Sequence, residues 1–196
     1  MTRNVDNRKD VLLLLLYSPG RSGQPNEPII GRTRLVKMLF LFQKEAMPHF
    51  RRGTMIAEDC FYEFFPWDFG PFSREVYDDI NFFTLRGFIA ASDVQEETIP
   101  ESAAEWEEWL SCSRADSSAE SISDEYKEVS FQLTEKGQRF AADLFASLSS
   151  AQKKLLHEFK KRTVAVPLKA LLRYVYQTYE DMTSKSTIKE QVLGSG

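Results

Sequence analysis

Residues 69–89, FGPFSREVYDDINFFTLRGFI, predict a turn, a helix and the beginning of a strand, and the rest of the chain is interpreted around them. The Gly70-Pro71 pair is typical of a chain reversal, and Ser73 suits the N-cap of the helix that follows. Gly87 falls where a helix often ends in a left-handed residue. The apolar residues that share one face of this helix are Val76, Ile80 and Phe83.

Two strands are expected to follow this helix and to pair with each other. Residues 88–94 leave the helix as an apolar strand, and residues 126–133 alternate well enough for a second one. This order is typical of winged-helix domains, in which the helix is the recognition helix and the strands form the wing. We therefore predict a mainly α fold with a small antiparallel β wing (α+β), a winged-helix-like domain with extra C-terminal helices.

The first 67 residues predict two helices and an aromatic segment. Residues 8–17 contain five consecutive leucines, so a short helix here would be apolar on every side and would lie at the centre of the molecule. A buried strand is the alternative for so short a run. A second helix is expected to open at residues 31–33, with Thr33 as its N-cap, and to end at Pro48. The aromatic residues 61–67 are expected to be extended and packed.

Three helices are predicted after the wing. Thr134 is expected to cap a helix over residues 135–148, and another helix runs over residues 151–162. Pro167 suits the first position of a last long helix over residues 168–179. We expect all 196 residues to form a single domain. It comprises a winged-helix-like core over about residues 8–148, an acidic insertion in the wing over about residues 95–125, and a C-terminal helical extension over about residues 150–192.

The charge of the chain is unevenly distributed. The net charge is −4, which argues against a dedicated nucleic-acid-binding protein. Residues 93–128, however, hold 12 acidic and 2 basic side chains, so the remainder of the chain carries +6. Acidic side chains are therefore concentrated in one insertion, and residues 111–124 within it have the Ser-, Asp- and Glu-rich composition of a mobile segment.

Nothing in the sequence predicts a catalytic or metal site. The two histidines, His49 and His157, are not spaced for metal binding, and the two cysteines lie far apart. A surface position for His49 and a buried apolar position for Cys60 are favoured over catalytic roles. The apolar run in residues 11–17 is far shorter than the ~20 residues that cross a bilayer. We expect a cytoplasmic protein without enzymatic activity, cofactor, metal or membrane association.

DNA binding is one function that a winged helix suggests. Asp78 and Asp79 are interpreted as a solvated helix face, which disfavours insertion of this helix into the major groove. Lys153, Lys160 and Lys161 are spaced to share one helical face, although a solvated surface explains such charges equally well. The residues that would contact phosphates or bases are Arg32, Arg34, Lys37, Arg51, Arg52, Ser73, Arg74, Asn81, Lys153, Lys160 and Lys161.

Binding of a protein partner is the function that we favour. Trp106 and Trp109 lie in the acidic insertion, where local core packing does not account for both of them. Because tryptophan is enriched in interface hot spots, these two residues are the predicted partner-binding site. A disordered insertion with incidental tryptophans is the alternative.

Five stretches, taken in their order along the chain, resemble a known family. They are GRTRLVK (31–37), FYEFFPWDFGPFS (61–73), LRGFI (85–89), FQLTEKG (131–137) and LLRYVY (171–176). Together they resemble the YwgA-like group of small bacterial proteins and, more distantly, the Panacea antitoxin-like domains, which share a Gly-Pro-(Phe/Tyr)-Ser turn before a helix. The acidic insertion departs from that pattern.

The resemblance implies a winged-helix-like, mostly helical fold without enzymatic activity. From the Panacea relatives it further implies neutralisation of a partner toxin. We therefore expect a regulatory protein that binds a protein partner, either a toxin or a component of a phage-defence system. A sequence-specific transcriptional regulator is the alternative, and an enzyme with an unrecognised site is a weaker one.

Overall fold

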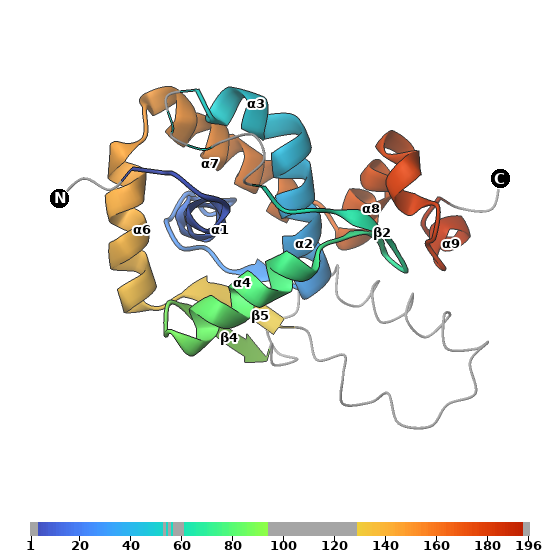
Figure 1. Cartoon of the computed structure of the whole chain (residues 1–196), viewed down its shortest axis with the longest axis horizontal. Coiled ribbons are helices and arrows are strands. Elements are labelled where there is room, and N and C mark those ends of the chain that lie inside the picture. The colour runs from blue at the N-terminus through green and yellow to red at the C-terminus, as the bar shows by residue number, and fades with distance from the viewer. Residues whose placement is uncertain (1–3, 53, 55, 57–60, 94–128, 194–196) are drawn as a thin grey trace.

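The computed structural model describes residues 4–52, 54, 56, 61–93 and 129–193, and its centre is a single helix. Helix α1 (Arg8–Tyr17) is capped by Asn7, whose side chain accepts the backbone N–H groups of Lys9 and Asp10. All five of its leucines are completely buried. Figure 1 looks almost along this helix and shows α2, α3, α4, α6 and α7 arranged around it. The predicted central position of residues 8–17 is confirmed, and the alternative of a buried strand is wrong.

The second helix does not end where the sequence predicted. Helix α2 (Arg32–Leu41) begins after Gly31, which has φ 92° and is the N-cap in place of Thr33. A π-helical stretch, η1 (Phe42–Ala46), and helix α3 (Met47–Phe50) then continue it without a break. Pro48 lies in α3 directly after the π-helical stretch, and the helix continues through it although proline has no N–H to donate. The residue that was expected to stop the helix is therefore tolerated within a longer one.

The predicted helix after the Gly-Pro turn is confirmed as α4 (Arg74–Leu85). Its inner residues, Val76, Ile80 and Phe83, are buried, and Gly87 adopts the expected left-handed conformation with φ 69°. Asp79 was predicted to be solvated, but it is buried and bridges to Arg8 at 3.2 Å and Lys9 at 3.0 Å. These ion pairs join α4 to the first turn of the central helix. Of the two aspartates, Asp78 is the exposed one.

The strands form two small antiparallel sheets. The predicted wing pair is confirmed as β4 (Ile89–Asp93) and β5 (Val129–Leu133), with Ile89 opposite Leu133. A strand of two residues that the sequence did not predict, β1 (Ile29–Ile30), pairs with the other edge of β5. The second sheet is a hairpin of β2 (Phe65–Trp67) and β3 (Gly70–Phe72), which immediately precedes α4.

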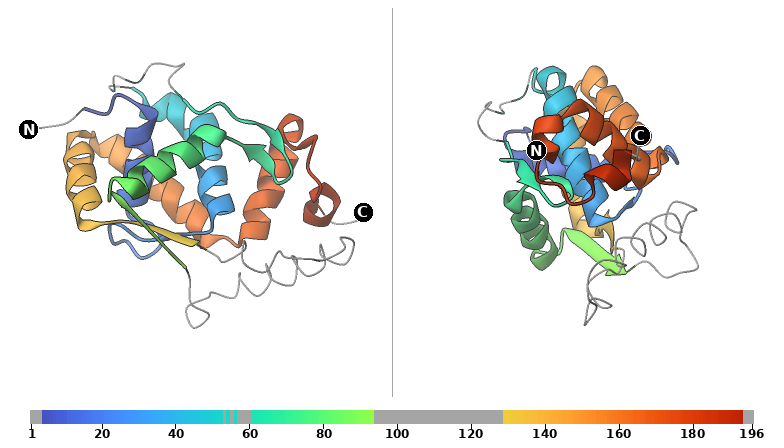
Figure 2. Two further views of the ribbon diagram at one scale, coloured as in Figure 1. Left: turned by 60° about the horizontal axis from the view of Figure 1, so that its bottom comes forward. Right: turned by 90° about the vertical axis from the view of Figure 1, so that its right-hand side faces the viewer.

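The C-terminal helices surround the same core. Helix α6 (Glu135–Ser147) begins at Thr134, whose hydroxyl accepts the N–H of Gly137 as predicted. Helix α7 (Ser150–Ala165) packs on α1 and α3, and α8 (Leu168–Thr178), which follows Pro167 as its N-cap, packs on α2. The chain ends in a 3-10 turn, η3 (Glu180–Thr183), and in α9 (Lys189–Leu193). Figure 2 shows these last elements beside the hairpin at one end of the molecule.

The observed fold is thus mainly helical with small antiparallel sheets. The acidic insertion, including Trp106 and Trp109, lies outside the described residues. Among the residues that are described, no helix combines the length and the apolar character needed to span a membrane.

Candidate protein-interaction site

The β2–β3 hairpin presents aromatic rings on one face. In the register of the hairpin Phe65 lies opposite Phe72 and Trp67 lies opposite Gly70. Because side chains alternate along a strand, Phe65, Trp67 and Phe72 share a face, and the two prolines between them share the other. The centroid of the Phe72 ring lies 5.3 Å from that of Phe65 and 5.2 Å from that of Tyr77 on α4. We call Phe65, Trp67, Phe72 and Tyr77 the aromatic platform.

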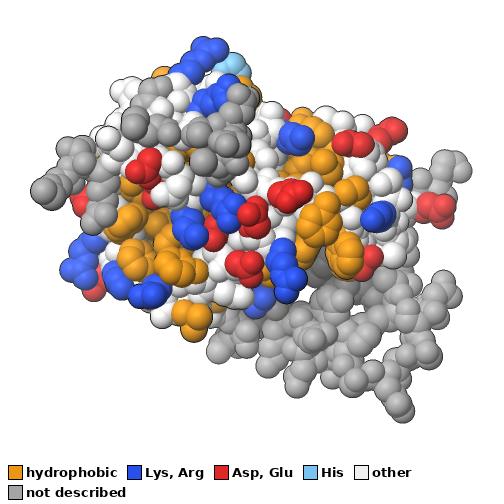
Figure 3. All heavy atoms as spheres, viewed as in Figure 1, with side chains coloured by type: hydrophobic (Ala, Val, Ile, Leu, Met, Phe, Trp, Pro, Cys, Tyr) orange, Lys and Arg blue, Asp and Glu red, His pale blue; other side chains and the backbone are white. Residues whose placement is uncertain are grey.

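The aromatic platform is unusually open for rings of this size. Trp67 is 49% exposed and Phe65 is 38% exposed, while Phe72 and Tyr77 are half-buried. Figure 3 shows apolar side chains gathered on the surface over the hairpin. Exposed apolar patches of this kind mark interaction surfaces in many proteins. The sequence predicted an extended and packed aromatic segment; Phe65 and Trp67 are extended in β2, but their rings are exposed rather than packed away from solvent.

The hairpin is held by the C-terminal part of the chain. At the turn, the carbonyl of Asp68 accepts the N–H of Thr187 at 3.1 Å and the hydroxyl of Ser186 at 2.9 Å. Ser186 is also hydrogen-bonded to the hydroxyl of Tyr176, at 2.6 Å. Gly70 has φ 80°, and a Cβ at this position would lie 3.0 Å from the Tyr176 ring. The platform is therefore a preorganised surface rather than a free loop.

Lys37 supports the hairpin from inside. Its ammonium donates to the carbonyl of Pro71 at 2.8 Å, and the side chain is 3% exposed. Burial lowers the pKa of Lys37 to about 7. A cavity of about 40 Å³ adjoins this lysine between α2 and the hairpin. Its walls are formed by Thr33, Val36, Lys37, Trp67, Phe69, Gly70, Phe72 and Tyr77.

Three of the predicted nucleic-acid contacts are buried and bind backbone carbonyls instead. Lys160 donates to the carbonyls of Leu16 and Glu27, at 2.7 and 2.8 Å. Arg34 donates to the carbonyls of Thr163 and Val166 at 2.8 Å each. The last carbonyls of a helix have no partner within it, so Lys160 caps α1 and Arg34 caps α7. Because these two and Lys37 are buried, their assignment to a nucleic-acid surface is corrected.

The remaining predicted contacts are distributed over several elements. Ser73 is completely buried as the N-cap residue of α4, so it cannot contact a base, and its hydroxyl makes no hydrogen bond to a described group. Arg51 and Lys153 are half-buried, and Lys153 donates to the carbonyl of Ala146 at 3.4 Å. The exposed members of the predicted set are Arg32, Arg52, Arg74, Asn81 and Lys161.

The outward side of α4 continues the surface of the platform. It carries Arg74, Asp78 and Asn81, followed by two apolar side chains, Phe82 and Leu85. Leu85 is 87% exposed, although the inner residues of the same helix are buried in the core. The charge of Arg32, on the neighbouring α2, also acts on Tyr77, whose pKa is raised by burial and partly lowered by this arginine. Exposed charged residues of both signs thus adjoin the platform, namely Arg32, Arg74, Asp68 and Asp78.

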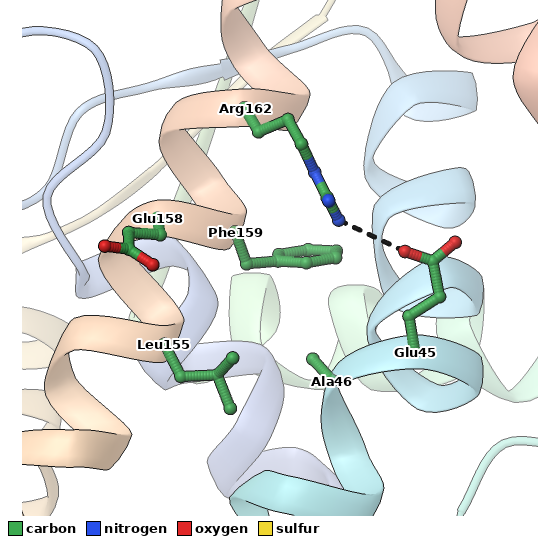
Figure 4. A pocket seen from close by; sticks show the side chains of 6 residues that line it. All are labelled: Glu45, Ala46, Leu155, Glu158, Phe159 and Arg162. Atoms are coloured by element: carbon green, nitrogen blue, oxygen red, sulfur yellow. Dashed lines mark hydrogen bonds and ion pairs between the residues drawn. The ribbon is translucent and has the colours of Figure 1, made fainter.

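A second hollow lies on the other side of α2, between η1 and α7. It has a volume of about 460 Å³ and is drawn in Figure 4, where Arg162 reaches across to Glu45. The Glu45 carboxylate accepts from Arg162 at 3.1 Å, and from the hydroxyls of Tyr174 at 2.9 Å and Tyr179 at 3.3 Å. Because these donors satisfy the carboxylate, we interpret the hollow as the place where η1, α7 and α8 are tied together.

Comparisons with other proteins do not assign this site. The chain matches no family model, no curated protein and no solved structure. Within the described part of the chain, no three His, Cys, Asp or Glu side chains are grouped to hold a metal ion. The aromatic platform was missed by sequence reasoning, although the alternation of Phe65 and Trp67 around a proline was a signal that both rings would share one face.

Proposed function

We propose that this protein is a non-enzymatic regulator with a winged-helix-like core, and that it binds a protein partner through the aromatic platform. The observation that carries the proposal is the exposure of Trp67 and Phe65 on a hairpin fixed by hydrogen bonds and by a close glycine contact. Rigid aromatic side chains bury a large apolar area with little loss of conformational entropy, and they dominate interface hot spots.

A second consideration supports a protein partner over DNA. Affinity for DNA depends on Lys and Arg side chains that neutralise phosphates. Three basic side chains that would serve this purpose are buried against backbone carbonyls. The winged-helix-like interpretation is supported by the order of elements, in which α4 is followed by the paired strands β4 and β5, with β1 beside β5. We further propose, from the resemblance described above, an antitoxin-like or phage-defence-associated role in bacteria.

The test is purification of the tagged chain from its native host with variants of the platform. We expect a second protein in stoichiometric amount with the unaltered chain, and a loss of at least tenfold in its recovery with Trp67→Ala, since hot-spot truncations cost roughly 2 kcal/mol or more. Tyr174→Ala is the matched control because Tyr174 is an aromatic residue on α8 with a similar exposure of 45%.

Two results would overturn the proposal. One is equal recovery of the second protein with Trp67→Ala and Tyr174→Ala, which would place the contact elsewhere. The other is binding to duplex DNA at submicromolar concentration with an affinity that falls steeply as salt rises, which would favour the transcriptional regulator. Co-expression of the gene adjacent to this one, with growth as the readout, then tests the antitoxin role.

A further inference from the structure

The amine of Lys37, which lines the cavity, has hydrogen-bonding capacity that the described residues do not use. A lysine ammonium has three N–H donors. In the described part of the chain Lys37 makes one hydrogen bond, to the carbonyl of Pro71. The side chain is almost completely buried, and it lines a cavity whose other walls are largely aromatic. A buried polar group without partners is costly, so this arrangement favours a ligand that supplies an acceptor.

The charge and size of the cavity limit the kinds of ligand that it could bind. Lys37 is the charged residue among those that line the cavity, and the charge of Arg32 also acts on Tyr77 in its wall, so an anion is favoured. A volume of about 40 Å³ is a few times the ~10–15 Å³ that one water molecule needs, so only a small group fits. A planar carboxylate suits a space of this size between ring faces, whereas a nucleobase is much too large.

We infer that this cavity receives the carboxylate of an aspartate or glutamate side chain of the partner protein, with Lys37 as the charged contact. The inference rests on the proposed function, because it describes what the partner inserts beside the aromatic platform. Apolar residues flanking the acidic one pack on Trp67 and Phe65, and the ammonium–carboxylate pair fixes the register of the partner. Charge-assisted hydrogen bonds of this kind are about twice as strong as neutral ones.

The state of Lys37 gives the inference a direct readout. Burial lowers its pKa to about 7, so near neutrality the amine is partly uncharged. A carboxylate in the cavity favours the charged form, and a bound acidic side chain therefore raises this pKa. A neutral ligand that packs on the same rings leaves it unchanged or lowers it further by excluding water.

The experiment is an NMR titration of the full chain with two blocked tripeptides, acetyl-Phe-Glu-Phe-amide and acetyl-Phe-Gln-Phe-amide. The observed signals are the indole N–H of Trp67 and the side-chain resonances of Lys37, which also give its pKa. We expect the glutamate peptide to bind about tenfold more tightly than the glutamine peptide and to raise the pKa of Lys37 by about one unit. In Lys37→Met the preference for glutamate should disappear, whereas Lys161→Met, which alters an exposed lysine that does not line the cavity, should retain it.

Each outcome distinguishes the inference from the proposed function. If both peptides shift the Trp67 signal with equal affinity, the carboxylate contact is overturned while platform binding stands. If neither peptide acts up to about 10 mM, the inference is overturned, and the proposed function is decided by the Trp67→Ala purification alone. A larger rise in the pKa of Lys37 with inorganic phosphate than with acetate would also overturn it. If Lys37→Met does not fold, the pKa of Lys37 with each peptide bound decides the matter in the unaltered chain.

Discussion

Lys160 and Lys37 are both buried and both have a pKa lowered to about 7, yet they differ in the number of hydrogen-bond acceptors around the amine. Lys160 lies in the closed interior with two carbonyl acceptors, and the charge of Glu27 partly opposes the effect of burial on its pKa. Lys37 has one carbonyl acceptor among the described residues and borders a cavity. Two lysines of the same type and burial thus have different amounts of unused hydrogen-bonding capacity.

This difference separates a structural cation from one that is available to a ligand. At the end of α1 the ammonium of Lys160 donates to a buried helix terminus that has few other donors available. Beside the hairpin, the ammonium of Lys37 supports Pro71 and leaves donors at the edge of the aromatic platform. Burial alone does not distinguish the two lysines, because the number of acceptors and the presence of adjoining space make the distinction.

Replacing each lysine by methionine breaks this comparison most directly. Lys160→Met leaves the buried carbonyl of Leu16 and the part-buried carbonyl of Glu27 without this donor, and we expect it to lower the free energy of unfolding by about 2–4 kcal/mol. Lys37→Met strands one carbonyl and removes a poorly satisfied charge, so we expect a loss of about 1 kcal/mol or less. Urea denaturation of both variants at neutral pH measures the two values. An equal or larger loss for Lys37→Met would contradict the idea that its donors are spare.

The pH dependence of stability tests the protonation of both lysines. The unfolded chain holds the proton of each lysine up to about pH 10.4, while the folded chain releases it near pH 7. Between these values the unfolded state binds more protons, so stability rises with pH, by at most about 1.4 kcal/mol per pH unit for each lysine. The slope should be measured by denaturation from pH 7 to about pH 9, before the tyrosines titrate.

Lys37→Met should remove the contribution of Lys37 to that slope and keep the contribution of Lys160. Lys160→Met should remove the contribution of Lys160 and keep that of Lys37. The exposed Lys161 provides the control, because Lys161→Met should leave the slope unchanged. A flat profile in the unaltered chain would mean that water or another acceptor keeps both ammonium groups charged.

Gly70 forms part of the wall of the Lys37 cavity and tests how rigid that wall is. Gly70→Ala forces a side chain into a backbone with φ 80° and places Cβ 3.0 Å from the Tyr176 ring. The left-handed conformation alone costs roughly 1–2 kcal/mol, so we expect a loss of about 2 kcal/mol in denaturation. Gly23→Ala is the matched control, because Gly23 has φ 73° and open space around it. A loss no greater than that of Gly23→Ala would show that the hairpin yields at this point.

The same comparison explains which parts of the molecule could be predicted from its sequence. The helices α1, α4, α6 and the pairing of β4 with β5 follow from local signals such as apolar spacing and caps. The positions of Arg34, Lys37 and Lys160 do not, because their acceptors lie 34 to 144 residues away along the chain. The chemistry that made these residues candidates for phosphate binding, donation to oxygen, is satisfied instead by backbone carbonyls at the termini of other elements and in the hairpin.

The alternation of Phe65 and Trp67 shows that the two rings share a face, but it does not show whether that face is exposed. The chain has fifteen phenylalanines, and the sequence pattern does not show which of them are buried and which are exposed. Phe40 and Phe65 look equivalent in composition, but Phe40 is buried in α2 whereas Phe65 is exposed on a hairpin strand. Only the register of the hairpin decides which ring faces outward.

The smallest change in stability is expected where the largest change in binding is predicted. Trp67 is half exposed and packs on neighbouring rings of the platform. The centroid of its ring lies 6.0 Å from that of Phe65 and 6.1 Å from that of Phe72. Trp67→Ala should therefore change the free energy of unfolding by about 0.5–1 kcal/mol. Its measured cost by denaturation, set beside that of Lys160→Met, shows whether the ring contributes to the fold. A loss above about 3 kcal/mol, as for a buried aromatic residue, would make Trp67 part of the core and would remove the argument that its exposure is maintained for a partner.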